Sequence, residues 1–195
     1  PLWYTSVSEE HRAIRQAAGL FDVGHMGIFL VSGPHATQFL DLVSTNFVQK
    51  LKPGTSQYSY LLDPDGQVLD DIMIYRLDDS DYLLVVNAAN AAKDWAWLNA
   101  VNEARVLIDR ERPEKVSPVT ATIADLKSPA AGAAQCLDLA LQGPASLRIL
   151  QELLPDEPAR RKLARLRRTE LVRLRLAGVD AIVARTGYTG EEFGY

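Results

Sequence analysis

The stretch YSYLLDPDGQVLDDIMIYRLDDSDYLLVV, residues 58–86, decides the fold class, because it reads as three strands separated by two turns. In the first turn, Asp-Pro-Asp-Gly, proline presets φ and glycine accepts a positive φ. The second turn is Asp-Asp-Ser-Asp. Connections this short favour consecutive antiparallel pairing, so the stretch predicts a β-meander. Its strands are expected over residues 58–62, 68–77 and 82–86.

Helical and extended segments surround this meander. Helix 7–18 is expected to begin at Ser8 as N-cap and to stop at Gly19, and helix 91–102 is expected to begin at Asn90. Further helices are expected over 35–43, 145–154 and 159–168, and extended segments over 20–31, 137–141, 171–176 and 181–183. Runs of strands with helices between the runs predict an α+β fold with antiparallel sheets.

The predicted organisation has two subdomains. The meander and its helix, residues 57–104, form one of them. Residues 1–56 and 105–195 form a discontinuous first subdomain. The segments 109–115 and 128–134 are expected to be exposed loop, because the first is dense in charge and the second in small residues.

Composition excludes several classes of protein. The chain has 195 residues, 47% hydrophobic and 24% charged, which is typical of a globular protein with one or two domains. Its net charge of −4 lacks the basic footprint of a nucleic-acid binder. No apolar run is long enough to span a bilayer. The single cysteine, Cys136, rules out an internal disulfide and fits a reducing compartment, so we expect a cytoplasmic protein.

The common catalytic motifs are absent. The sequence contains no G-x-G-x-x-G, no P-loop, no H-E-x-x-H, no C-x-x-C and no G-x-S-x-G. Its three histidines do not form a metal-binding spacing, and no metal is expected. These absences argue against a nicotinamide enzyme, a P-loop enzyme, a zinc hydrolase and a serine hydrolase of the common type.

The middle strand of the meander carries the first candidate site. Alternate residues of a strand point to opposite faces, so Asp71 shares a face with Tyr75, whereas Asp70 belongs to the other. Tyr58 and Tyr60 share a face of the partner strand. A carboxylate among tyrosine rings could hold a flat heterocycle. The plainer interpretation is a solvated strand whose tyrosines cover their neighbours, and strand pattern alone favours it.

Four further features of the sequence have a plain structural interpretation, and two of them also have a functional one. Asn87 ends the third strand, and Asn90 follows it; both fit strand-end or capping roles. Tyr188 lies between two glycines in Arg-Thr-Gly-Tyr-Thr-Gly-Glu. That segment is either a glycine-rich turn or a backbone that approaches a ligand closely. The basic stretch 160–175 is most simply a solvated face, and the alternative is a docking patch for an acidic partner.

Six segments, in order along nearly the whole chain, resemble the T-protein (aminomethyltransferase) family of the glycine cleavage system. They are FDVGHMG at 21–27, QYSY at 57–60, DDIMIY at 70–75, VVNAAN at 85–90, LQGP at 141–144 and RTGYTGE at 185–191. The resemblance implies a folate-binding fold in which three domains surround a central channel. It also implies that the chain is truncated before a C-terminal β-barrel.

The resemblance implies tetrahydrofolate-dependent aminomethyl transfer from the lipoyl arm of a carrier, the H-protein, giving 5,10-methylenetetrahydrofolate and ammonia. The family's catalytic aspartate matches Asp71, and its folate-lining residues match Tyr58, Tyr75, Asn87 and Tyr188. Asn90 would contribute through its backbone. Neither a nucleic acid nor a membrane is implied as a partner, and a eukaryotic member would lie in the mitochondrial matrix.

The chain departs from the family pattern at three places. Gly24 replaces a usual serine, residues 110–135 look like an insertion, and the chain ends in Gly-Glu-Glu-Phe-Gly-Tyr where Gly-Glu-Asp-Gly-Phe is usual. We expect a piece of a longer protein that does not turn over by itself. The alternatives are a related folate-dependent demethylase or the folate domain of an oxidoreductase, and a non-enzymatic folate-binding protein of the same fold.

Overall fold

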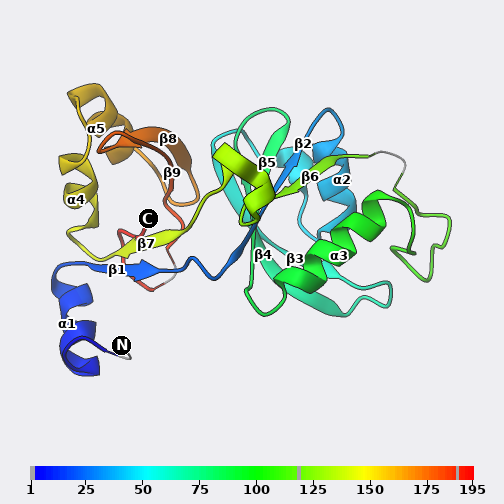
Figure 1. Ribbon diagram of the computed structural model, residues 1–195, viewed down its shortest axis with the longest axis horizontal. Helices are drawn as coiled ribbons and strands as arrows, with labels where there is room; N and C mark the ends of the chain where they lie inside the picture. Colours follow the sequence, from blue (N-terminus) through cyan, green and yellow to red (C-terminus); the bar gives the residue numbers. More distant parts are fainter. Residues whose placement is uncertain (1–2, 118–119, 188) are drawn as a thin grey trace. The chain divides into compact units, whose positions relative to one another are not determined.

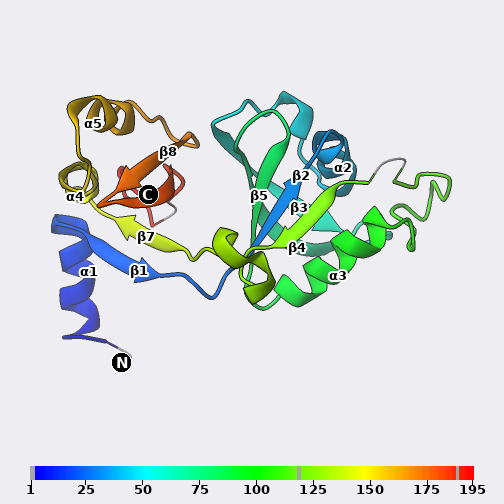
Figure 2. The same ribbon diagram turned by 45° about the horizontal axis from the view of Figure 1, so that its top comes forward.

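The computed structural model describes residues 3–117, 120–187 and 189–195. The chain divides into two compact units (Figures 1 and 2). One is the continuous segment Gly24–Leu137, and the other combines Pro1–Val23 with Asp138–Tyr195. Both contain helices and antiparallel strands, so the α+β class is confirmed.

The larger unit is built on a five-stranded antiparallel sheet with the order β3-β4-β5-β2-β6. Its strands are β2 Gly27–Ser32, β3 Thr55–Leu62, β4 Val68–Arg76, β5 Asp81–Val86 and β6 Thr122–Asp125. The predicted meander is therefore confirmed as β3-β4-β5. Its first strand begins three residues earlier than expected.

The boundaries of the two units differ from those of the predicted subdomains. The prediction had one subdomain over residues 57–104 and the other over 1–56 and 105–195. The cause is lateral pairing across the sheet. Strand β2 lies between β5 and β6, with Phe29 opposite Leu84 on one side and Asp125 on the other. Segments on both sides of the meander in sequence thus belong to its sheet, and the unit runs from Gly24 to Leu137.

Two helices, α2 Ala36–Val43 and α3 Ala91–Asn102, pack against this sheet and close one hydrophobic core (Figure 1). The alternation predicted for β4 holds, because Ile72 and Ile74 are buried in the core while Asp71 is exposed. The largest fully buried apolar side chains of this core are Tyr82, Phe39, Leu40, Leu61, Ile72, Ile74, Leu84 and Leu98.

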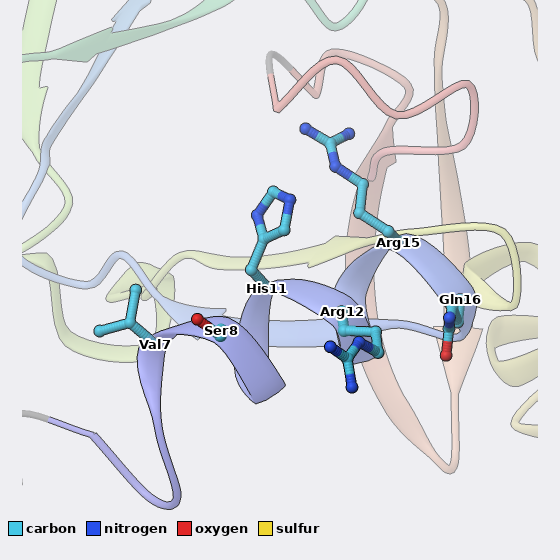
Figure 3. Close-up of a pocket in the computed structure, with 6 residues that line it drawn as sticks. All are labelled: Val7, Ser8, His11, Arg12, Arg15 and Gln16. Atoms are coloured by element: carbon cyan, nitrogen blue, oxygen red, sulfur yellow. The ribbon is translucent and has the colours of Figure 1, made fainter.

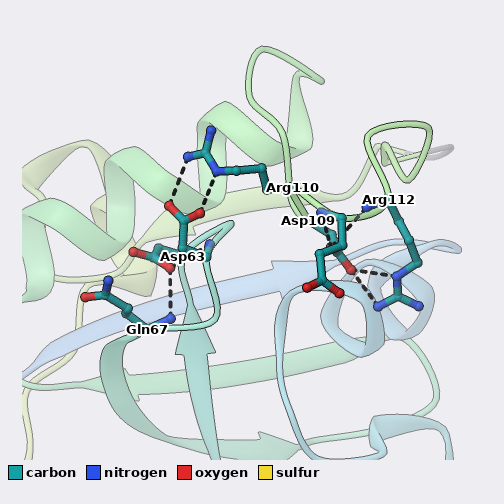
Figure 4. Close-up of polar contacts among 7 residues, drawn as sticks. Asp63, Gln67, Asp109, Arg110 and Arg112 are labelled. Atoms are coloured by element: carbon teal, nitrogen blue, oxygen red, sulfur yellow. Dashed lines mark hydrogen bonds and ion pairs between the residues drawn. The ribbon is translucent and has the colours of Figure 1, made fainter.

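Residues 109–115, predicted as exposed loop, belong to the connection between α3 and β6, which is fastened to the turn between β3 and β4 (Figure 4). Arg110 donates to both carboxylate oxygens of Asp65, at 2.5 and 2.9 Å, and its backbone N–H donates to the carbonyl of Pro64 at 3.0 Å. The Arg110 guanidinium lowers the pKa of Asp65 below its ordinary value. The second part of the expected insertion contains β6 and the short 3-10 helix η2 Pro129–Ala134. A further 3-10 helix, η1 Val48–Lys50, follows α2.

In its described residues, the smaller unit contains two two-stranded sheets and three helices. The elements are α1 Val7–Gln16, β1 Gly19–Asp22, β7 Leu139–Gln142, α4 Ser146–Glu152, α5 Glu157–Ala164, β8 Leu171–Leu176 and β9 Val179–Ala184. Its apolar cluster includes Leu150, Leu154, Leu163 and Val172. The N-cap of α1 is Ser6 and not Ser8, because the Ser6 hydroxyl accepts the backbone N–H of Glu9.

A buried amide, the side chain of Gln142, contacts the glycine-rich end of the chain. Gln142 is 2% exposed; its Oε1 accepts from the Thr189 hydroxyl at 2.8 Å, and its Nε2 donates to the Tyr195 carbonyl at 3.3 Å. A Cβ at Gly187 would lie 2.3 Å from Gln142 Oε1, and one at Gly194 would lie 2.4 Å from it. Both positions require glycine because a Cβ at either one would meet this amide and also the Cα of the other glycine, at 2.7 and 2.8 Å.

A contact between two buried carboxyl groups joins α3 to the sheet. Asp94 of α3 is 0% exposed and Asp70 of β4 is 2% exposed. Neither Asp94 oxygen has a hydrogen-bond donor among the described residues. Two ionised carboxylates cannot hydrogen-bond, so their contact is stable only when one of them keeps a proton. Burial, followed by the neighbouring Asp70, raises the pKa of Asp94 to about 8.

No helix in the described ranges combines the length and the apolar character needed to cross a membrane.

We expect Asp94→Asn to raise the free energy of unfolding at neutral pH. The folded state keeps a proton on Asp94 that the unfolded state releases above its ordinary pKa of 3.8. The stability contributed by that proton is present below pH ~4 and is lost as pH rises through about 8, at up to about 1.4 kcal/mol per pH unit. An amide neither titrates nor repels Asp70.

Urea unfolding of the full-length protein at pH 4, 6 and 8 measures this effect, with the gain from Asp94→Asn growing towards pH 8. Parallel stability profiles for the two proteins would contradict it. The lowered pKa of Asp70 has the opposite effect on the pH dependence of stability. The stability contributed by its ionised form is lost as pH falls through its folded-state pKa.

A second prediction concerns the glycine contact with Gln142. Gly187→Ala should lower the thermal midpoint, with a cost of about 1–3 kcal/mol, because the new methyl group meets both the buried Gln142 amide and the backbone of Gly194. The matched control is the same change in a Gln142→Ala background, where the amide is gone but the Gly194 Cα, 2.7 Å from the new methyl group, remains, so the cost should fall without vanishing. An equal cost in both backgrounds, measured as a double-mutant cycle, would show that Gln142 is not the obstacle.

Candidate carboxylate site on strand β4

Asp71 lies on the exposed face of β4, and hydrogen bonds hold both of its carboxylate oxygens. The Tyr58 hydroxyl, from β3, donates to Oδ2 at 2.5 Å. The Asn87 side-chain amide, from the segment after β5, donates to Oδ1 at 3.0 Å and to the Asp71 carbonyl at 3.0 Å. A carboxylate held at both oxygens has a fixed orientation.

Strand register explains why Asn87 reaches Asp71. Strands β4 and β5 pair antiparallel with Met73 opposite Val85. Continued by two residues, this register places Asn87 opposite Asp71. The first residue beyond β5 therefore lies beside the exposed carboxylate although sixteen positions separate the two in sequence.

Asp70 points to the other face and anchors the same asparagine from below. Its Oδ2 accepts the Asn87 backbone N–H at 2.9 Å, and its Oδ1 accepts the side-chain amides of Asn87 at 2.9 Å and Asn90 at 2.5 Å. Burial alone would raise the pKa of Asp70, but the hydrogen bonds from Asn87, Asp94 and Asn90 outweigh it and lower the pKa. Asp70 is thus the ionised member of the buried carboxyl pair.

Lys93 fixes the orientation of the Asn90 amide. Its ammonium donates to Asn90 Oδ1 at 2.9 Å and to the Leu69 carbonyl at 2.6 Å. Since an ammonium only donates, the amide oxygen must face Lys93 and the amide nitrogen must face Asp70. Asn90 occupies the N-cap position of α3, as expected, but its side chain makes no capping bond and serves the carboxylate instead.

Two tyrosine rings stand beside Asp71 on the open face. Tyr58 is 47% exposed and Tyr60 is 39% exposed, and their rings meet edge to face with centroids 5.3 Å apart. The hydrogen bond to Asp71 raises the pKa of Tyr58, so its hydroxyl remains a donor at neutral pH. Exposed aromatic surface next to a fixed carboxylate can bind a flat ring that carries N–H donors.

The predicted site residues are only partly brought together. Tyr58 and Asn87 contact Asp71 directly, whereas the side chain of Asn90 contacts Asp70. Tyr75 lies on the same strand face four residues along β4, opposite Ser56 and Leu83. Tyr188 lies outside the described residues.

Sequence reasoning missed Asp70, Lys93 and Asp94 as parts of the site. The alternation of strand residues correctly placed Asp70 and Asp71 on opposite faces. It did not reveal that Asn87 forms hydrogen bonds with both of them. Extending the β4–β5 register by two residues is the signal that would have found the bridge. In the described parts of the chain, no group of three or more histidine, cysteine or carboxylate side chains is arranged to hold a metal ion.

A shallow hollow along α1 is a separate surface feature (Figure 3). All six lining side chains come from that one helix, and none of them is buried. They include His11, Arg12 and Arg15, and Arg15 forms an ion pair with Glu191. Because one helix supplies all of these side chains, the hollow brings no groups from different elements together, and the Asp71 cluster remains the candidate site.

Comparison with known proteins places the chain in a family. The sequence model of the GCVT N-terminal domain matches residues 1–195. A protein named aminomethyltransferase from Symbiobacterium thermophilum is 43% identical over 194 residues, which are 98% of this chain and 46% of that protein. Another of the same name, from Thermus thermophilus, is 44% identical over 98% of this chain and 48% of that protein.

Solved structures agree with this placement. The glycine cleavage system aminomethyltransferase T from Bartonella henselae aligns with a TM-score of 0.72 and 31% identity, over 95% of this chain and 43% of that one. A heterotetrameric sarcosine oxidase from Corynebacterium sp. U-96, at 15% identity and a TM-score of 0.51, shares the fold alone. The chain spans about half the length of the curated relatives it matches. It belongs to the family of GCVT N-terminal domains, the family of the glycine cleavage T-protein.

Proposed function

We propose that the protein containing this chain transfers an aminomethyl group from the lipoyl arm of a carrier protein to tetrahydrofolate. The observation that carries the proposal is Asp71, a carboxylate held at both oxygens on an open aromatic face, in a chain of this family. Relatives named aminomethyltransferase support this activity over that of a demethylase, an oxidoreductase or a non-enzymatic folate-binding protein.

In the proposed reaction the aminomethyl carbon changes partners without any oxidation or reduction. Its bonds to the lipoyl sulfur and to the amino nitrogen break, and two bonds to folate nitrogens form. The products are 5,10-methylenetetrahydrofolate, ammonia and the reduced dithiol of the lipoyl arm. Positive charge develops where the folate nitrogen attacks the iminium-like carbon.

Asp71 would stabilise that positive charge and orient the folate. A fixed carboxylate lowers the energy of a developing cation most when it needs no reorganisation, and Tyr58 and Asn87 supply that fixation. Tyr58 and Tyr75 would line the folate ring, together with Tyr188 from the glycine-rich segment. Asn90 would act through Asp70 and Asn87, since its side chain already binds Asp70.

The carrier would be the lipoyl-bearing H-protein of the glycine cleavage system. Tyr58 and Tyr60 are 47% and 39% exposed, so this chain supplies one open wall of the proposed folate site. The relatives are about twice as long as the chain, which supports the proposal that the rest of the protein supplies the remaining walls. The isolated chain is therefore proposed to be inactive, and assays need the full-length protein.

Asp71→Asn should lower kcat for aminomethyl transfer by about 10²–10³-fold, because it removes the charge while keeping the shape. The affinity for tetrahydrofolate should change little. Single-turnover transfer from the loaded carrier, with folate binding measured by calorimetry, tests this. The matched control is Asp79→Asn, an exposed carboxylate in the β4–β5 turn, which should behave like wild type. Near-normal turnover by Asp71→Asn would remove Asp71 from the mechanism.

The Tyr58 hydroxyl and ring should have separable effects. Tyr58→Phe removes one of the two donors to Asp71 and keeps the ring, so kcat should fall about 3- to 30-fold while KM for tetrahydrofolate stays nearly constant. Tyr58→Ala removes the ring as well and should also raise that KM. If Tyr58→Phe changed only KM, the hydroxyl would be a folate contact and not a support for Asp71.

A further inference from the structure

The buried carboxyl of Asp94 has no place in the proposed transfer, yet it lies directly beneath the residues that do. It is 0% exposed, and no hydrogen-bond donor reaches either oxygen in the described ranges. Burying a polar group without a partner is costly. Asp70 on β4 is the group that can offset this cost, and only if a proton lies between the two carboxyls.

The proton belongs on Asp94, because the two carboxyls differ in their donors. Asp70 accepts three N–H groups, the backbone and side-chain N–H of Asn87 and the side-chain amide of Asn90. These bonds favour a negative charge on Asp70. Asp94 has none of them, so it keeps the proton and can donate it to Asp70 as a hydrogen bond.

A continuous series of contacts leads from this pair to the exposed carboxylate. Asp94 supports Asp70, and Asp70 holds the Asn87 amide and backbone at 2.9 Å. The same Asn87 amide nitrogen binds Asp71 Oδ1 at 3.0 Å. Each link fixes the next, and Asn87 is the only residue in this series that touches both Asp70 and Asp71.

We propose that Asp94 is a positioning residue for Asp71: as a neutral acid beneath Asp70, it keeps Asn87 in the place from which its amide holds the Asp71 carboxylate. This role rests on the proposed aminomethyl transfer, since its consequence for activity is the orientation of Asp71. Asp94 touches neither Asp71 nor the open face. Its substitution should therefore change kcat and leave KM for folate nearly constant.

The arrangement is sensitive to high pH. Ionisation of Asp94 places a second negative charge beside Asp70, and like charges in a buried site repel strongly. Within the described residues, the charged groups facing Asp94 are Asp70 from β4 and Lys93 from its own helix. Asn87 and Asn90 carry no titratable charge, and Tyr58 is the titratable neighbour of Asp71 on β3.

The test compares Asp94→Asn and Asp94→Leu with wild type in the full-length protein, using the loaded lipoyl carrier and tetrahydrofolate from pH 6 to 9.5. Asp94→Leu lacks a donor for Asp70 and should lose at least about tenfold in kcat at pH 7, with KM for folate within about threefold. Asp94→Asn offers an N–H in place of the acid O–H. It should restore kcat to within about twofold and lack the wild-type decline of up to about tenfold per pH unit above pH 8.

A second measurement does not depend on activity. In protein labelled with ¹⁵N-asparagine, the side-chain amide of Asn87, assigned by its loss in Asn87→Ala, should shift with a midpoint near pH 8 in wild type but not in Asp94→Asn. Identical pH–rate profiles for wild type and Asp94→Asn, or an Asn87 amide that does not titrate, would overturn the positioning role. If the amide titrates but wild type transfers no aminomethyl group, the proposed function fails and the link from Asp94 to Asn87 is supported.

Discussion

A single proton held between two buried carboxyls is the constraint on which the Asp71 face depends. Asp94 and Asp70 come from a helix and a strand that pack against each other in the core of the larger unit, at 0% and 2% exposure. Two negative charges there would drive α3 away from β4. One proton replaces this repulsion with a hydrogen bond. The remaining lone pairs of Asp70 can then accept hydrogen bonds from Asn87 and Asn90.

The strands and faces of the meander could be predicted because their causes are local. A period of two decides which side chains enter the core, and the Asp-Pro-Asp-Gly turn decides where β3 reverses into β4. These rules separated Asp71 from Asp70 and grouped Asp71 with Tyr75. The choice of Asp71 as catalytic came from family resemblance, since a strand pattern cannot distinguish a reactive carboxylate from a solvated one.

The remaining features depend on contacts between distant segments, and no local pattern contains them. Strand β6 is four residues long, in a region dense in small and charged residues, and forms because β2 offers it an edge. The asparagine at the start of α3 has the composition of a cap, but a lysine one turn along and a carboxylate below give its amide better partners. The proton on Asp94 could not be read from sequence, because an aspartate after a lysine in a helix is ordinarily exposed and ionised.

The two adjacent aspartates of β4 do not by themselves determine the register of this strand in the sheet. If β4 slipped by one residue against its neighbours, each face of the strand would still carry one carboxylate, so the aspartates by themselves do not distinguish the two alignments. Ile72 and Ile74 favour the observed alignment, because a slip of one residue would expose them to solvent. Asn87 favours it as well, because a slip would remove it from its position opposite Asp71. Apolar side chains of the core therefore determine which of two chemically identical groups becomes the exposed carboxylate.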